Sequence, residues 1–160
     1  MITTLYIIIA AGLLAIFYGY IVGKQIISAS PGNSKMIEVA GAIQEGARAY
    51  LNRQYKTITI VGVIILIIVT FALGMWVGLG FFIGSFLSGV AGYVGMLVSV
   101  QANVRTAEAS RKGLGAGLNI SFKSGAVTGM LVAGLALLSI SFYYLILLKL
   151  NIDSRDIINA

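Results

Sequence analysis

The stretch TITIVGVIILIIVTFALGMWVGLGFFIGSFLSGVAGYVGMLVSVQANV, residues 57–104, carries no charged side chain. A helix needs roughly 20 apolar residues to cross the hydrocarbon core of a bilayer, so this run is long enough for two helices and a tight turn. Glycines gather near its centre beside Trp76, an aromatic residue suited to the headgroup boundary. We therefore expect membrane spans at about 57–78 and 81–104, joined by an outer turn at 74–80.

The composition of the whole chain agrees with this interpretation. Of its 160 residues, 59% are hydrophobic and 10% are charged, and the mean hydropathy is +0.99, whereas soluble domains carry about 25% charged residues. Two more uncharged runs predict spans at about 2–22 and 125–148. The first lacks the basic start and the cleavage site of a signal peptide, so we expect it to be retained. The fold class is an all-α integral membrane protein with four transmembrane helices, and 1–160 is a single membrane segment.

Basic residues predict the orientation of the four spans. Two of the eleven, Lys149 and Arg155, follow the last span. The other nine fall in segments 23–56 and 105–124: Lys24, Lys35, Arg48, Arg53, Lys56, Arg105, Arg111, Lys112 and Lys123. Because cytoplasmic loops collect lysine and arginine, we expect both segments in the cytoplasm and both termini outside, with 149–160 as an outer tail. The net charge of +6 is explained in this way, and no nucleic acid partner is expected.

Both cytoplasmic segments are expected to be helical connectors. A turn at 31–34 precedes an amphipathic stretch in which Ser34 is the expected N-cap and Glu45 can pair with Arg48. This helix either continues into the second span or lies on the membrane surface. Its apolar face is thin, with alanines where larger side chains would be needed, so we prefer the continuous helix.

The stretch GLNISFKS, residues 117–124, is one residue short of a phosphate-binding loop. The pattern needs a glycine directly before Lys123 and Ser124, so that the backbone can approach a phosphate. Phe122 stands there instead, and the preceding segment is a membrane helix rather than a buried strand. We therefore do not expect a phosphate site.

The glycines before this stretch do not make a dinucleotide-binding pattern either. Leu118 stands where a third glycine should follow Gly113 and Gly115. The segment is interpreted as a helix-turn-helix connector. We expect glycines to end one helix and a polar side chain to cap the next: Gly113, Gly115 and Gly117 before the turn, and Asn119, Ser121 or Ser124 as the cap.

Small residues recur at every fourth position in three of the spans. Such stripes let helices approach closely, and helix packing is the preferred interpretation; a specific ion-conducting interface is the alternative. The second span is bulkier and is expected to face lipid. The stripes are Ala11, Ala15, Gly19 and Gly23 in the first span, Gly84, Ser88 and Gly92 in the third, and Gly125, Gly129 and Ala133 in the fourth.

The side chains needed for catalysis or ion transport are scarce. The chain has no cysteine or histidine, and the four expected spans contain no ionisable Asp, Glu, Lys or Arg. Gln101 and Asn103 are the most polar residues near membrane depth, and the two aspartates, Asp153 and Asp156, lie in the tail. Ion pathways need charged or strongly polar groups within the membrane. The residues therefore predict no catalytic, substrate-binding, ion-pathway or metal site.

Two long strings resemble a known family. GAIQEGARAYLNRQYKTI (41–58) and ANVRTAEASRKGLGAGLNISFKSGAVTGMLVAGLALL (102–138) are similar to the N-terminal part of the membrane-integral, ion-translocating inorganic pyrophosphatases. This resemblance implies a homodimeric pump that hydrolyses magnesium pyrophosphate and moves protons or sodium ions out of the cytoplasm. The family's catalytic and gating residues belong to an inner ring of helices and to Asp-rich motifs that no position here matches.

The leading hypothesis is therefore the N-terminal outer-ring part of a pyrophosphate-energised proton pump, as a truncated product or one piece of a longer protein. The string at 41–58 looks more like the proton-pumping, potassium-independent branch. The implied cofactor is Mg²⁺ for the full-length family, with none bound here. The implied partners are the rest of the pump, a second copy and the bilayer, and the implied location is a bacterial inner membrane. Alone, the chain is expected to be inactive.

Two alternatives remain open. The chain could be a free-standing four-helix scaffold or assembly protein without enzymatic activity. A small four-helix exporter is disfavoured, because such transporters couple transport through an acidic residue at membrane depth, and the expected spans hold none.

Overall fold

The computed structural model describes residues 2–150 and contains four long helices. They are α1 (Ile2–Ser28), α2 (Ser34–Leu73), α3 (Met75–Ser110) and α4 (Leu114–Lys149). Each is long and apolar enough to cross a membrane. This confirms the expected all-α membrane fold with four transmembrane helices. Most of the expected outer tail lies outside the described residues.

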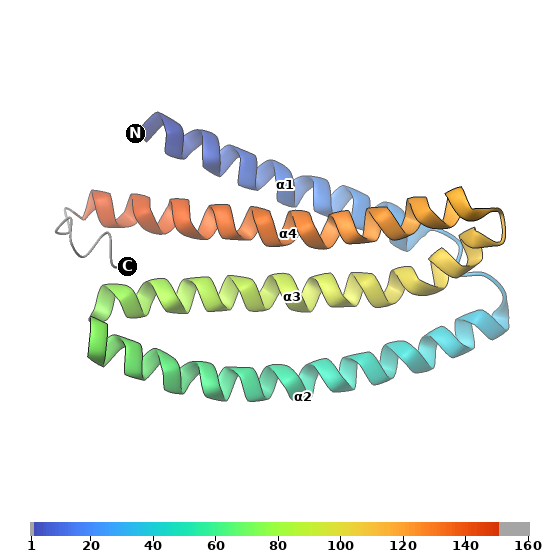
Figure 1. Cartoon of the computed structure of the whole chain (residues 1–160), viewed down its shortest axis with the longest axis horizontal. Coiled ribbons are helices and arrows are strands. Elements are labelled where there is room, and N and C mark those ends of the chain that lie inside the picture. The colour runs from blue at the N-terminus through green and yellow to red at the C-terminus, as the bar shows by residue number, and fades with distance from the viewer. Residues whose placement is uncertain (1, 151–160) are drawn as a thin grey trace.

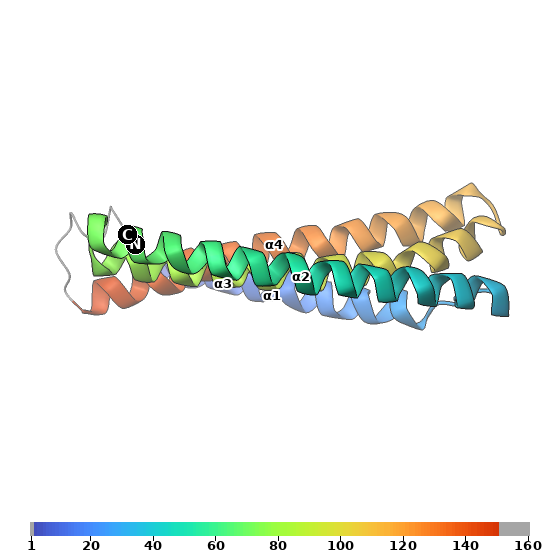
Figure 2. The same ribbon diagram turned by 90° about the horizontal axis from the view of Figure 1, so that it is seen from below.

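The helices form a row rather than a closed four-helix bundle. In the described residues α4 packs against both α1 and α3, α3 also packs against α2, and α2 contacts no other helix. Figure 1 shows this order as α1, α4, α3, α2, and the edge-on view in Figure 2 shows a twisted layer. Both faces of the layer are consequently uncovered within this part of the chain.

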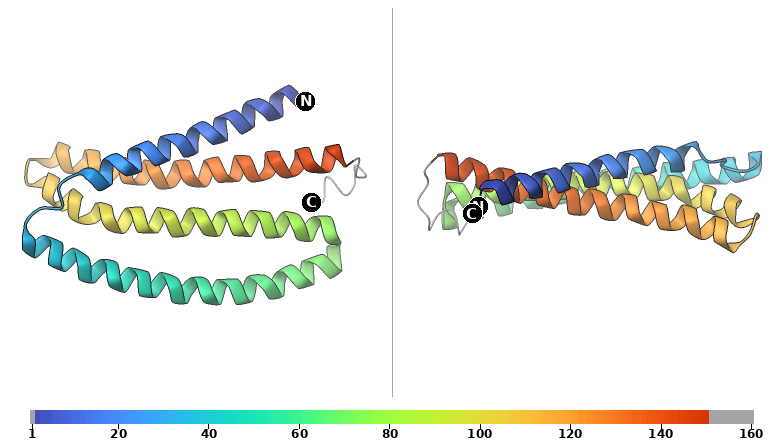
Figure 3. Two further views of the ribbon diagram at one scale, coloured as in Figure 1. Left: turned by 180° about the vertical axis from the view of Figure 1, so that it is seen from behind. Right: turned by 90° about the horizontal axis from the view of Figure 1, so that it is seen from above.

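The connections alternate between the two ends of the row. The start of α1, the α2–α3 turn and the end of α4 lie at one end, and segments 29–33 and 111–113 lie at the other (Figures 1 and 3). This is the alternation that the charge pattern requires, since the two basic segments fall at the same end. Their position in the cytoplasm stays a prediction.

The helices are much longer than the hydrocarbon core is thick. At 1.5 Å per residue, the 36 residues of α3 and the 40 residues of α2 reach about 54–60 Å, whereas the core measures about 30 Å. Tyr55 and Tyr93 each lie 19 residues from Gly74, a rise of about 28 Å. Their rings meet edge to face with centroids 5.2 Å apart. The core of the bilayer therefore fits between Gly74 and this pair, and the rest of both helices projects beyond it.

Helix α2 confirms that the connector runs without a break into the second span, and so excludes the surface-lying alternative. Its N-cap is Asn33 rather than Ser34, because the Asn33 side chain accepts a hydrogen bond from the Met36 N–H at 2.9 Å. The expected pair of Glu45 with Arg48 does not form. In the described residues the one ion pair joins Arg111 and Glu108 at 3.2 Å.

The expected outer turn was too broad, and two helices extend beyond the expected spans. The outer turn is Gly74 alone rather than 74–80, so Trp76 lies in the first turn of α3. Helix α1 continues to Ser28, beyond the span expected at 2–22, and α4 starts at Leu114, before the span expected at 125–148. Where the bilayer ends along these helices stays a prediction. Charged residues mark where the bilayer ends, but they do not end a helix, whose backbone hydrogen bonds are internal.

Each tight connection contains a glycine that reverses the chain, and a second glycine four residues later allows a close contact. Gly74 has φ +100° and Gly113 has φ +127°, a backbone region that disfavours side chains. Four residues further on, a Cβ on Gly78 would overlap the hydroxyl of Thr70. A Cβ on the equivalent glycine of the α3–α4 connection would overlap the hydroxyl of Ser110. Close approach therefore starts one turn after each reversal.

The small-residue stripe of α1 packs against α4, and part of the expected stripe takes part in this contact. Gly19 and Gly23 are buried, and Gly12 is buried where Ala11 is exposed. A Cβ on Gly12 would lie 3.1 Å from the Gly134 carbonyl oxygen, so the two backbones nearly touch at this crossing. The stripe therefore departs from the expected line only at its first position, where Gly12 replaces Ala11.

Of the other two stripes, the one on α3 packs in part and the one on α4 does not. Ser88 is exposed, but a Cβ on Gly92 would lie 2.7 Å from the Tyr55 hydroxyl of α2. Towards α4 the close contact of α3 is made by Gly95, whose Cβ would lie 2.8 Å from Thr128 Cγ2. On α4 the whole expected stripe is exposed, with no atom of the described residues within 4 Å of a Cβ on either glycine: Gly125, Gly129 and Ala133. The α4 stripe was correctly found as a pattern, but it faces away from the helices described here.

Candidate functional site

The near-match to a phosphate loop lies entirely inside a helix. Residues 117–124 belong to α4, where backbone N–H groups bond to carbonyls one turn earlier and are not available to a phosphate. Phe122 is 80% exposed, Ser124 is buried, and the Ser124 carbonyl accepts a hydrogen bond from Thr128 Oγ1 at 3.4 Å. The segment is therefore part of a helix rather than a loop, and the absence of a phosphate site stays a prediction.

The expected capping of this helix was wrong. Its N-cap is Gly113, which makes no side-chain capping bond, and the residues proposed as caps all lie within α4: Asn119, Ser121 and Ser124. Gly115 and Gly117 are helical as well. The positive φ of Gly113 reverses the chain by itself. The helix therefore starts without a side-chain cap, and the polar residues that follow lie inside it.

The Arg105 side chain makes four hydrogen bonds and joins the end of α1 to α3. Its Nε donates to the carbonyls of Ile27 and Ala29, both at 3.1 Å, and its Nη2 donates to Ile27 at 2.8 Å. Its Nη1 donates to the carbonyl of Gln101, one turn back on its own helix, at 2.7 Å. The last carbonyls of a helix lack partners within the helix, and they carry partial negative charge. Arg105 satisfies two carbonyls at the end of α1.

Sequence reasoning counted Arg105 only as an orientation signal. The usable signal was its place directly after the uncharged run, at the level where the preceding span must also end. An arginine fork with several donors is well suited to bind carbonyls there. Its position argues for a structural task, because its Nε and both terminal nitrogens are directed at backbone carbonyls.

A small cavity of about 300 Å³ lies beside this contact. It is formed by the end of α1, the end of α3 and the start of α4, and Arg105, Glu108, Lys112 and Asn119 are among its lining residues. Both signs of charge are present, and Arg105 already binds carbonyls. The cavity therefore lacks the set of free cationic donors that a phosphate site needs.

Gln101 and Asn103 do not form a joint polar site. Residues two apart point to different sides of a helix. The Gln101 carbonyl binds Arg105, whereas Asn103 is exposed beside an apolar groove between α2 and α3. At the opposite end of the row, the Tyr143 hydroxyl donates to the Trp76 carbonyl and ties α4 to the start of α3.

Carboxylates are too dispersed to hold a metal ion in the part of the chain that the structure describes. No group of three or more His, Cys, Asp or Glu residues comes together there. Its acidic residues are Glu38 and Glu45 on α2 and Glu108 on α3. Asp153 and Asp156, which the sequence places in the tail, lie outside the described residues.

Comparison with known proteins identifies a family over nearly the whole chain. The model of the family described as inorganic H⁺ pyrophosphatase matches residues 13–160. The chain is 46% identical, over 138 residues, to a K⁺-insensitive pyrophosphate-energised proton pump of Methanosarcina mazei. That match covers 85% of this chain and 21% of the relative.

Two further relatives show the same proportions. A putative K⁺-stimulated pyrophosphate-energised sodium pump of Bacteroides thetaiotaomicron is 42% identical over 146 residues, with 86% of this chain and 20% of the relative covered. A K⁺-insensitive proton pump of Caldanaerobacter subterraneus is 36% identical over 157 residues, with 88% and 22% covered. The chain thus spans about a fifth of the length of these relatives. With four helices that can span a membrane and a family match over residues 13–160, the chain belongs to the inorganic H⁺ pyrophosphatase family.

Proposed function

We propose that this chain forms the N-terminal outer part of a pyrophosphate-energised proton pump and supports the helices that carry catalysis and transport. The observation that carries the proposal is the family match over residues 13–160, combined with coverage of only about a fifth of each relative. The described residues add a second argument, because no group of three or more His, Cys, Asp or Glu side chains comes together in them.

The transported ion is proposed to be the proton. Relatives of both kinds match, but the relative at 46% identity is a proton pump, and so are those from Caldanaerobacter subterraneus and Chloroflexus aurantiacus. The string at 41–58 supports the same branch.

The reaction itself is assigned to the rest of the pump. Magnesium pyrophosphate would need clustered carboxylates, and the three acids of the described residues do not fit this requirement. Mg²⁺ and substrate would therefore bind to the remainder, and the complete protein would pair with a second copy in a bacterial inner membrane.

The proposal is tested by pyrophosphate hydrolysis in membranes that contain only residues 1–160, from cells without another membrane pyrophosphatase. We expect no magnesium-dependent activity above an empty-vector control, while the full-length Methanosarcina mazei relative, expressed in parallel, should be active. Activity of the 160-residue chain alone would contradict the proposed division of tasks and would direct attention to Asp153 and Asp156.

A further inference from the structure

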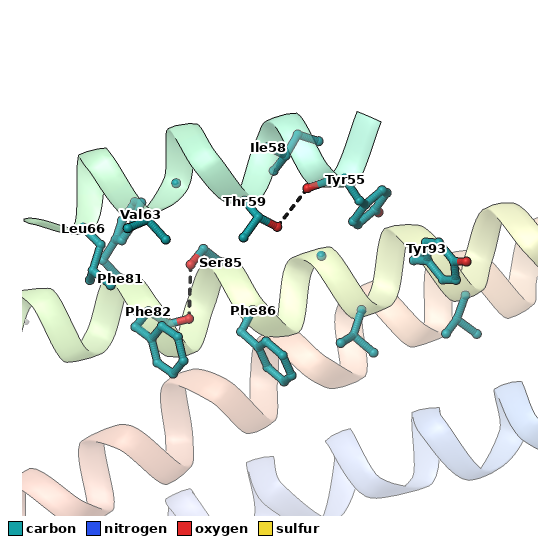
Figure 4. Close-up of a pocket in the computed structure, with 14 residues that line it drawn as sticks. Tyr55, Ile58, Thr59, Val63, Leu66, Phe81, Phe82, Ser85, Phe86 and Tyr93 are labelled. Carbon is teal, nitrogen blue, oxygen red and sulfur yellow. Dashed lines mark hydrogen bonds between the residues drawn. The ribbon is translucent and has the colours of Figure 1, made fainter. Parts of the chain in front are cut away.

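We draw no further inference here: the strongest candidate, the apolar groove of about 410 Å³ between α2 and α3, with Tyr55 and Tyr93 at one end and Leu66 and Phe81 towards the other (Figure 4), is an uncovered face, and nothing in the structure shows what covers it.

Discussion

Gly134 and Gly129 lie on the same helix and have opposite surroundings. A Cβ on Gly134 would be 2.9 Å from the Gly12 carbonyl oxygen and 3.2 Å from the Ala15 Cβ, whereas a Cβ on Gly129 meets nothing within 4 Å. Gly134→Ala should therefore destabilise the α1–α4 contact by about 1–3 kcal/mol, the usual range for overpacking. Denaturant unfolding in mild detergent, followed by circular dichroism, measures the difference.

Gly129→Ala is the matched control for this prediction. It makes the same change on the same helix in open space, and the higher helix propensity of alanine should leave stability unchanged or raise it by up to about 1 kcal/mol. If both variants unfolded alike, the close crossing of α1 and α4 would not contribute to stability as described.

Arg105 gives the second prediction at this scale. Arg105→Gln removes the hydrogen bonds to the carbonyls of Ile27 and Ala29, and bonds to charged groups contribute about 1.5–3 kcal/mol. The end of α1 should loosen, so limited proteolysis within 29–33 should become faster. Lys112→Gln, an exposed residue of the next connection, should cleave at the wild-type rate, and faster cleavage there too would indicate a general effect of lost charge.

At the scale of elements, the connection between α2 and α3 depends on one residue. Gly74 has φ +100° and ψ 166°, a region that is nearly restricted to glycine, although a Cβ there has open space around it. Gly74→Ala should therefore cost roughly 1–3 kcal/mol through backbone strain alone.

Thermal unfolding of Gly74→Ala against Gly84→Ala checks this origin. Gly84 is helical and its Cβ position is equally open, so its substitution should not destabilise. A neutral Gly74→Ala would mean that the turn adopts another backbone conformation without penalty.

Sequence patterns predicted the number and type of the elements but not their ends. Uncharged runs indicated all four helices, because a long apolar run identifies a segment that can cross the bilayer. The glycines between 74 and 80 read as a broad turn, yet only Gly74 has positive φ, and Gly78 serves close packing against Thr70. A glycine that turns the chain and one that admits a neighbouring side chain look the same in sequence.

The contacts of Arg105 show the same limit. A residue pattern can place an arginine at the end of a span, but the carbonyls that it binds lie 76 and 78 residues away in sequence. The α4 stripe is the converse case, since Gly125, Gly129 and Ala133 form a clear pattern whose partner is not among the described helices. The spacing of small residues along a helix indicates a surface suited to helix packing. Which helix covers that surface depends on the tertiary arrangement.

At the scale of the whole molecule, the two sets of connections are expected on opposite sides of the membrane. The chain has no cysteine, so single cysteines report topology without background. In intact cells, Met75→Cys should react with a membrane-impermeant maleimide, and Lys112→Cys should react only after permeabilisation. The reverse pattern would contradict the charge-based orientation, and equal labelling of both would contradict the four spans.

The central claim is that this chain is the supporting part of a pump whose catalytic groups lie elsewhere. Its most direct test is magnesium-dependent pyrophosphate hydrolysis by a Methanosarcina mazei relative from which the segment matched by this chain has been deleted, expressed with and without residues 1–160. The account predicts that neither piece is active alone and that the two together hydrolyse pyrophosphate. Full activity of the deleted relative without this chain, or activity of this chain by itself, would contradict it.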